Sequence, residues 1–129
     1  MISRVKLVSI PVADQARAVR FYTEKLGCRV TSDQPYDGKQ RWIELALPGG
    51  GTRIVPFVFE GMEDRVGTFQ NVVFTADDVE ATYRELTALG VEFVQPPKTE
   101  EWGTGAVFRD SEGNMFALTS GVDAGSGGR

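Results

Sequence analysis

The chain has 129 residues, of which 41% are hydrophobic and 25% charged, and its formal net charge is −4. This length and composition are typical of one soluble globular domain, and no apolar run approaches the roughly 20 residues that cross a bilayer. The 14 lysines and arginines are scattered along the sequence, whereas nucleic-acid binding requires a basic footprint. Because the first residues also lack the pattern of a signal peptide, we expect a cytoplasmic protein that binds neither nucleic acid nor a membrane.

The chain contains no histidine, and Cys28 is its single cysteine. Histidine is the commonest general base and the commonest ligand of transition metals. A single cysteine forms no internal disulfide. Any chemistry would therefore have to use carboxylates, hydroxyls, amines or one thiol.

The first half of the chain begins with a strand that runs directly into a helix. Alternating residues over 7–12 predict the strand. Asp14 stands where a helix N-cap is expected, apolar residues at helical spacing predict a helix over 15–26, and Gly27 follows as a C-cap. Three strand-like runs come next, "CRVTS", "RWIELAL" and "TRIVPFVF", separated by the turn sequences "PYDGK" and "PGGG". This half therefore reads β-α-β-β-β.

The second half repeats the same order of elements. Its strand and helix lie in "NVVFTADDVEATYRELTALG", residues 71–90, with Asp78 as the N-cap and Gly90 as the C-cap. The runs "VEFVQ", "GAVFRD" and "MFALTS" predict three more strands. "QPPKTEEWGT" is expected to form a longer loop, and in the tight turn "DSEG" Asp110 is expected to cap backbone amides. A repeat of this size indicates two units that each bury one face.

Three segments together resemble the vicinal oxygen chelate superfamily, which includes glyoxalases, bleomycin-resistance proteins and ring-cleaving dioxygenases. They are "VSIPVADQARAVRFYTEKLGCRV", "VVFTADDVEATYRELTALGVEFV" and "WGTGAVFRDSEGNMFALT". The last is similar to the family ending F-x-D-P-D-G-N, with Ser111 and Glu112 in place of the proline and the second aspartate.

The resemblance implies an α+β fold. Two tandem βαβββ modules, over about 3–60 and 69–120, would form a curled mixed sheet around a cleft within one domain of residues 1–120. It also implies a homodimer, and leaves open whether each cleft is built from one chain or from two. The tail, residues 121–129, is rich in glycine and small residues, and we expect it to be disordered.

The positions at which metal-using members of the family carry their ligands hold unsuitable residues. Counting from the cap aspartates places Leu7 and Asn71 where those members have histidines. Counting from the glycine of the last turn places Ala117 where they have a glutamate. A hydrocarbon, an amide and a methyl group do not form a divalent-metal site. The resemblance therefore implies a member without a metal or another cofactor.

Strand alternation predicts which side chains would line the cleft. Alternate residues of a strand point to the same face, so residues an even number of positions from Leu7, Asn71 or Ala117 on their strands would line the cleft. In "RWIELAL" the apolar alternate residues are expected to pack under the helices, which places Trp42 and Glu44 on the cleft wall. Trp102 lies in a glycine-rich loop where a lid would be. The predicted ligand-binding residues are Leu7, Ser9, Trp42, Arg53, Phe57, Asn71, Val73, Trp102 and Ala117. For Phe57, Phe59 and Phe108 we favour a place in the core or in a dimer interface, and for Trp42 and Trp102 such a place is the alternative.

Glu44 is the candidate catalytic residue. A carboxylate beside Trp42 and opposite a methyl-lined strand would be partly desolvated, the environment of a general base. The alternative, which we favour, is that Glu44 pairs with a nearby arginine such as Arg53 or simply reaches solvent.

Three functions remain open on this basis. One is metal-independent binding of a small organic molecule, such as an aromatic or antibiotic-like compound, in the cleft. The second is a metal-free isomerase, epimerase or lyase that uses Glu44 as base. The third is a catalytically silent, dimeric interaction module.

Overall fold

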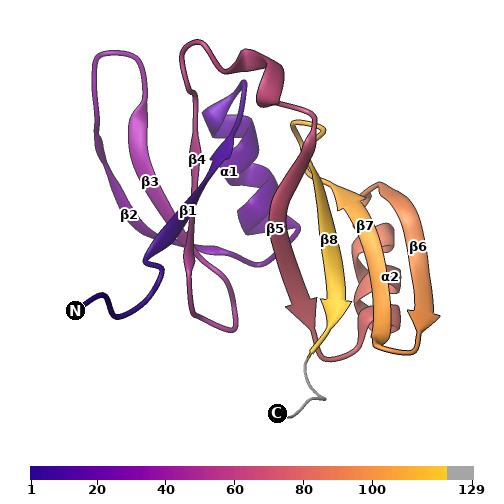
Figure 1. Ribbon diagram of the computed structural model, residues 1–129. Coiled ribbons are helices and arrows are strands. Elements are labelled where there is room, and N and C mark those ends of the chain that lie inside the picture. Colours follow the sequence, from indigo (N-terminus) through magenta and orange to yellow (C-terminus); the bar gives the residue numbers. More distant parts are fainter. Residues whose placement is uncertain (122–129) are drawn as a thin grey trace. The chain divides into compact units, whose positions relative to one another are not determined.

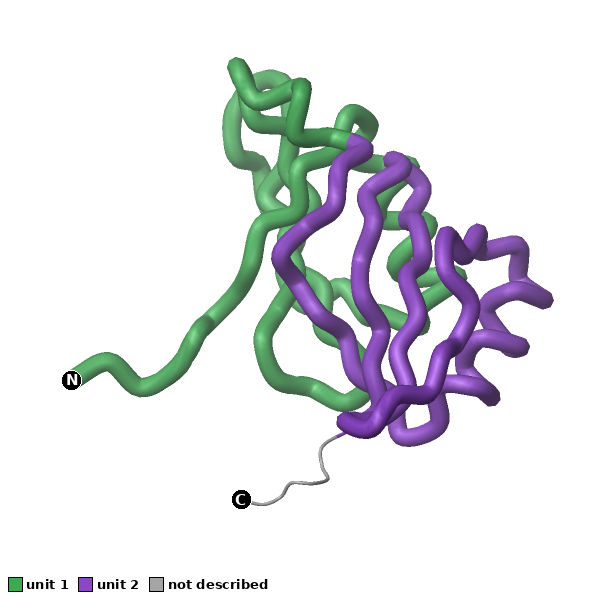
Figure 2. The backbone as a smooth tube through the Cα atoms, turned by 45° about the vertical axis from the view of Figure 1, so that its right-hand side comes forward, with its two compact units in different colours: residues 1–66 green, residues 67–129 purple. Residues whose placement is uncertain are grey.

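The computed structural model describes residues 1–121, and these form two compact units, one over residues 1–66 and one that starts at Gly67 (Figures 1 and 2). Each unit has the element order β-α-β-β-β, so the predicted α+β fold with two βαβββ modules is confirmed. A short 3-10 helix, Glu63–Arg65, lies at the end of the first unit. Residues 122–129, most of the tail expected to be disordered, lie outside the described part.

The first unit is a four-stranded mixed sheet in the order β1-β4-β3-β2. Strand β1 runs parallel to β4, and the other neighbours are antiparallel. Helix α1 packs on one face of this sheet (Figure 1). The elements are β1 (Leu7–Pro11), α1 (Gln15–Glu24), β2 (Arg29–Pro35), β3 (Arg41–Ala46) and β4 (Arg53–Phe57).

The second unit repeats this topology, with the sheet order β5-β8-β7-β6 and β5 parallel to β8. Helix α2 packs on one face of the sheet (Figure 1). The elements are β5 (Phe69–Ala76), α2 (Val79–Ala88), β6 (Phe93–Glu100), β7 (Gly103–Arg109) and β8 (Met115–Ser120).

Both helices begin at the predicted aspartates. The Asp14 carboxylate accepts a hydrogen bond from the backbone N–H of Arg17, and Asp78 accepts one from Ala81, which satisfies a donor that the helix leaves open. Helix α1 ends at Glu24, two residues before the predicted end. At Gly27 the chain then adopts a left-handed conformation, with a φ of 75°, which favours glycine.

The core of each unit lies between its helix and the covered face of its sheet. In the first unit Tyr22 of α1 packs there with Ile10, Leu45 and Ile54, all at most 1% exposed. In the second unit Phe74, Phe108 and Phe116 form a cluster with ring centroids 5.1 to 5.8 Å apart. Phe108 therefore has the core role considered for it from the sequence. Each sheet's other face carries no helix of its own unit; we call it the helix-free face.

The segment "QPPKTEEWGT" is not the loop that the sequence predicted. Residues up to Glu100 belong to β6, which pairs with β7 as a long hairpin. Strand β6 lies at the edge of the sheet and pairs with one neighbour only. The N–H groups that Pro96 and Pro97 lack are therefore not needed for hydrogen bonds to a second strand. The register shifts between Gln95 and Lys98, so the irregularity spans both prolines. The loop prediction was wrong because edge strands tolerate proline.

The turn between β7 and β8 is held by buried polar side chains. Asp110 accepts hydrogen bonds from the backbone N–H groups of Glu112 and Asn114, as its turn position predicted. Asn114 is fully buried, and its side-chain oxygen accepts from the N–H of Gly67 and from the Gln70 side chain. This network ties the last turn of the unit to the start of β5.

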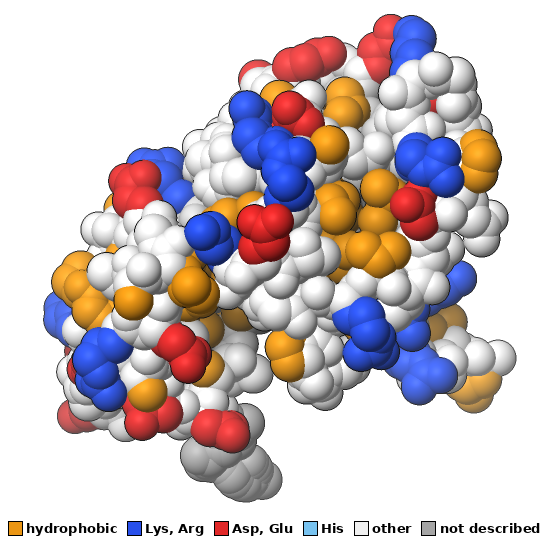
Figure 3. Space-filling model, turned by 180° about the vertical axis from the view of Figure 1, so that it is seen from behind, with side chains coloured by type: hydrophobic (Ala, Val, Ile, Leu, Met, Phe, Trp, Pro, Cys, Tyr) orange, Lys and Arg blue, Asp and Glu red, His pale blue; other side chains and the backbone are white. Residues whose placement is uncertain are grey.

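Within residues 1–121, no helix is long and apolar enough to cross a membrane. On the side of the molecule drawn in Figure 3, acidic and basic side chains are interspersed.

Candidate functional site

The strand register places several of the predicted residues on the helix-free face of the first sheet. Leu45 pairs with Ile54 in the core, so the preceding residues, Glu44 and Arg53, point to the other face. Strand β1 adds Leu7 and Ser9, which pair with Arg53 and Val55 of β4. Their role as ligand contacts stays a prediction.

Four aromatic residues cluster on this face. Trp42 of β3 stacks on Tyr36 at 6.0 Å and meets the edge of Phe57 at 5.7 Å. Phe57 also contacts Tyr36 and Phe59, each at 5.0 Å. Phe57 is 8% exposed, whereas Tyr36 is 58% exposed. This aromatic cluster (Tyr36, Trp42, Phe57 and Phe59) thus has a buried floor and an accessible rim.

Glu44 is engaged through both of its carboxylate oxygens. Oε2 accepts a 2.9 Å hydrogen bond from the indole N–H of Trp42, and Oε1 lies 3.6 Å from the Arg53 guanidinium. The same guanidinium donates to the Thr31 hydroxyl at 2.7 Å. The pairing with Arg53 considered from the sequence is therefore present, and this geometry suits a fixed acceptor better than a proton-abstracting base.

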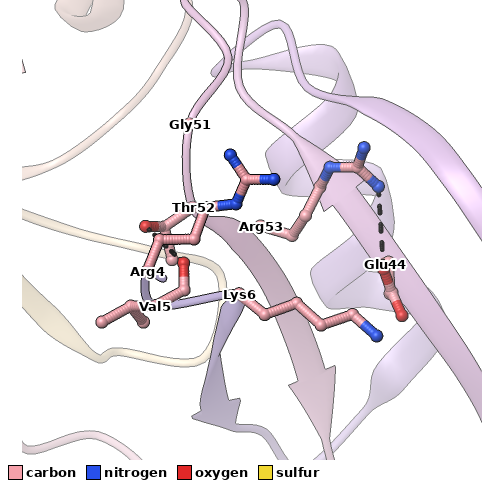
Figure 4. A pocket seen from close by; sticks show the side chains of 7 residues that line it. All are labelled: Arg4, Val5, Lys6, Glu44, Gly51, Thr52 and Arg53. Atoms are coloured by element: carbon pink, nitrogen blue, oxygen red, sulfur yellow. Dashed lines mark hydrogen bonds and ion pairs between the residues drawn. The ribbon is translucent and has the colours of Figure 1, made fainter. Parts of the chain in front are cut away.

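A pocket of about 710 Å³ lies beside this pair, lined by residues 4–6, 51–53 and Glu44 (Figure 4). Its volume is in the range of small-molecule sites. The chain before β1 is held there by backbone contacts: the Lys6 carbonyl accepts from the Arg53 N–H, and the Val5 carbonyl accepts from the Thr52 hydroxyl.

Sequence reasoning missed Arg4, Lys6 and Thr52 in the pocket, and Tyr36 in the aromatic cluster. All four lie outside the strands, where strand alternation does not predict the direction of a side chain. A usable signal was the pair of cations in "SRVK", placed directly before the first strand.

The remaining predicted residues lie in the second unit. Val73 of β5 pairs with Ala117 of β8 on the helix-free face, and Asn71 is an exposed residue of β5. Trp102 is 64% exposed. Its ring lies over Gly105, where an added Cβ would come within 2.9 Å of the indole atom Cη2.

The three positions at which the family resemblance places metal ligands hold Leu7, Asn71 and Ala117. Hydrocarbon side chains and a single amide do not supply the charged oxygens, imidazoles or thiolates of a divalent-metal site. Within residues 1–121 the structure also brings together no three aspartate, glutamate, cysteine or histidine side chains as a metal site. The donor set at these positions does not fit a metal.

Comparison with known proteins agrees with the fold and the resemblance. Residues 4–118 match the family described as Glyoxalase/Bleomycin resistance protein/Dioxygenase superfamily. The uncharacterized protein YetH of Bacillus subtilis is 36% identical, over 92% of this chain and 98% of YetH.

Solved structures of similar proteins include TnmS3, an antibiotic binding protein from Streptomyces sp. CB03234. It is 34% identical, with a TM-score of 0.81 over 92% of this chain and 96% of TnmS3. A superfamily member from Sphaerobacter thermophilus is 29% identical, with a TM-score of 0.83 over 92% of this chain and 98% of its own. The chain therefore belongs to the glyoxalase, bleomycin-resistance protein and dioxygenase superfamily.

Proposed function

We propose that this member of the superfamily binds a small organic molecule with a planar aromatic part, on the helix-free face of the first sheet and without a metal ion. The observation that carries the proposal is the aromatic cluster. Its floor, Phe57, is buried, while Tyr36 at the rim is accessible. Aromatic rings in offset or edge contact recruit a further ring in the same geometries.

Two features beside the cluster support a binding site. The indole N–H of Trp42 is fixed by Glu44, so the ring is already oriented before a ligand arrives, which lowers the entropy cost of binding. The pocket next to Glu44 has room for a small molecule. The similarity to an antibiotic binding protein supports the same class of ligand.

The proposal requires no chemical step. Because both oxygens of Glu44 already face donors, the carboxylate acts as a fixed acceptor that orients Trp42 and Arg53. The homodimer that the family resemblance implies stays a prediction.

The two tryptophans of the chain allow a direct test by fluorescence. Trp102→Phe leaves Trp42 as the reporter, and Trp42→Phe leaves Trp102. Titration with phenylnaphthylamine, a neutral aromatic probe, should quench the emission saturably in the Trp102→Phe variant. Trp42→Ala should weaken probe binding about tenfold, as expected for the loss of one ring contact and its buried area. Quenching confined to the Trp42→Phe variant, or unchanged affinity in Trp42→Ala, would contradict the proposal.

A further inference from the structure

The pocket beside Glu44 carries an excess of positive charge. Arg4, Lys6 and Arg53 line it, and Glu44 is its one acidic residue (Figure 4). The whole chain, in contrast, has a formal net charge of −4. The proposed binding of a neutral ring does not explain why an acidic protein has a local cluster of positive charges here.

The single carboxylate is already committed. Glu44 is 14% exposed, and it pairs with Arg53 and with the Trp42 indole. The Lys6 side chain extends through the pocket toward Glu44 (Figure 4). Among residues 1–121, neither Arg4 nor Lys6 forms an ion pair. Two positive charges of the pocket are therefore left without compensation.

Arg53 itself is held in a defined direction. One of its guanidinium nitrogens donates to the Thr31 hydroxyl and faces Glu44. These two residues of the sheet therefore fix the orientation of the guanidinium group. The Arg53 side chain is still 40% exposed. An arginine whose planar group is oriented in advance, and which keeps free donors, suits the recognition of a carboxylate or a phosphate.

We propose that the cation pocket formed by Arg4, Lys6 and Arg53 binds an anionic group of the ligand, a carboxylate or a phosphate or sulfate ester. This inference rests on the proposed function, because the pocket and the aromatic cluster are joined through Glu44: one carboxylate contacts both Trp42 and Arg53. A ligand that covers both would be an aromatic acid, with its ring on Trp42 and its acid group at the cations.

A matched pair of fluorescent probes tests this inference. Anilinonaphthalene sulfonate and phenylnaphthylamine share one ring system, and the first also carries a sulfonate. The wild-type protein should bind the sulfonate about three- to tenfold more tightly than the neutral probe, as two partly solvated ion pairs allow. Added salt should weaken binding of the sulfonate and spare the neutral probe.

The variant Arg4→Gln/Lys6→Gln should remove this preference and leave the affinity for phenylnaphthylamine unchanged. Both side chains are exposed, so the fold should be kept, which circular dichroism verifies. The matched control is Arg20→Gln/Arg84→Gln, which removes two exposed cations from the helices and should keep the preference. Competition by benzoate and by phenyl phosphate then distinguishes a carboxylate from a phosphate ligand.

The outcomes separate the two proposals. Equal affinities for both probes, with no effect of Arg4→Gln/Lys6→Gln, would overturn the anion pocket and leave the aromatic site standing. Weaker sulfonate binding in that variant, together with unchanged binding in Trp42→Ala, would support the pocket and contradict the aromatic site. Equal losses of sulfonate affinity in the variant and in its control would mean that the protein's cations attract the sulfonate nonspecifically, and would overturn the pocket.

Discussion

The indole N–H of Trp42 donates a 2.9 Å hydrogen bond to Oε2 of Glu44, two residues further along the same strand. Residues two apart share a face of a strand, and the other oxygen of Glu44 faces Arg53 on β4. This short chain of contacts joins the aromatic cluster to the cation pocket. The central claim is that the two form one binding surface on the first sheet.

Replacing Glu44 by glutamine tests the role of its charge. Glu44→Gln keeps an acceptor for the Trp42 indole but removes the ion pair with Arg53, so we expect a loss of about 1 kcal/mol in the free energy of unfolding. Because the pocket becomes more positive, the affinity for anilinonaphthalene sulfonate should rise. Binding of the neutral probe should not change, because glutamine still orients the Trp42 ring and the proposed site carries out no proton transfer. A fall in affinity for both probes would contradict this account.

Asn114 should be a stability determinant of the second unit. It is fully buried, and its side-chain oxygen accepts from Gly67 and Gln70. Asn114→Ala removes both of these hydrogen bonds and the one that the Asn114 amide nitrogen donates to the buried Asp110 carboxylate, so the free energy of unfolding should fall by about 2–4 kcal/mol in urea titrations. The control Asn71→Ala replaces an exposed asparagine of β5 and should change it by less than about 0.5 kcal/mol. Equal effects of the two variants would show that the turn network is not the cause.

Gly105 should position the ring of Trp102. A Cβ at this site would lie 2.9 Å from the indole, so Gly105→Ala should displace the exposed ring rather than unfold the sheet. In the Trp42→Phe background we expect a shift of the Trp102 emission maximum with little change in the unfolding free energy. Gly38→Ala, where an added Cβ meets nothing within 4 Å, should leave the spectrum unchanged. An unshifted spectrum in Gly105→Ala would show that Trp102 does not rest on this glycine.

Cys28 should be unreactive in the native protein and should make stability depend on alkaline pH. It is 7% exposed, and burial raises the pKa of its thiol from 9.0 to about 11. The folded state thus favours the neutral thiol; this stability is fully present below pH 9 and is lost as the pH rises toward 11. The wild type should lose more stability over this window than Cys28→Ala. Parallel losses, or rapid labelling of the native thiol at pH 8, would contradict the burial argument.

The sequence allowed the fold and part of the site to be predicted, because both rest on local regularities. Asp14 and Asp78 are cap residues whose role depends on their own backbone, and strand alternation predicted that Trp42 and Glu44 face the same way. Arg4, Lys6 and Tyr36 lie before or between strands, where no period indicates direction. Their place in the site follows from pairing between segments distant in the sequence, such as the Lys6 carbonyl with Arg53. The sequence predicted the start of β6 in "VEFVQ" but not its extension to Glu100, because the two prolines are compatible with a strand only at an edge.

The most direct test of the central claim is a heteronuclear NMR titration of the uniformly nitrogen-labelled protein with phenylnaphthylamine. Two tryptophans give two indole N–H signals, and Trp42→Phe and Trp102→Phe assign them. The account predicts a saturable shift of the Trp42 indole, together with backbone shifts in β3 and β4, which lie side by side in the sheet (Figure 1). Shifts confined to the second unit, or a Trp42 indole signal that does not move, would contradict it.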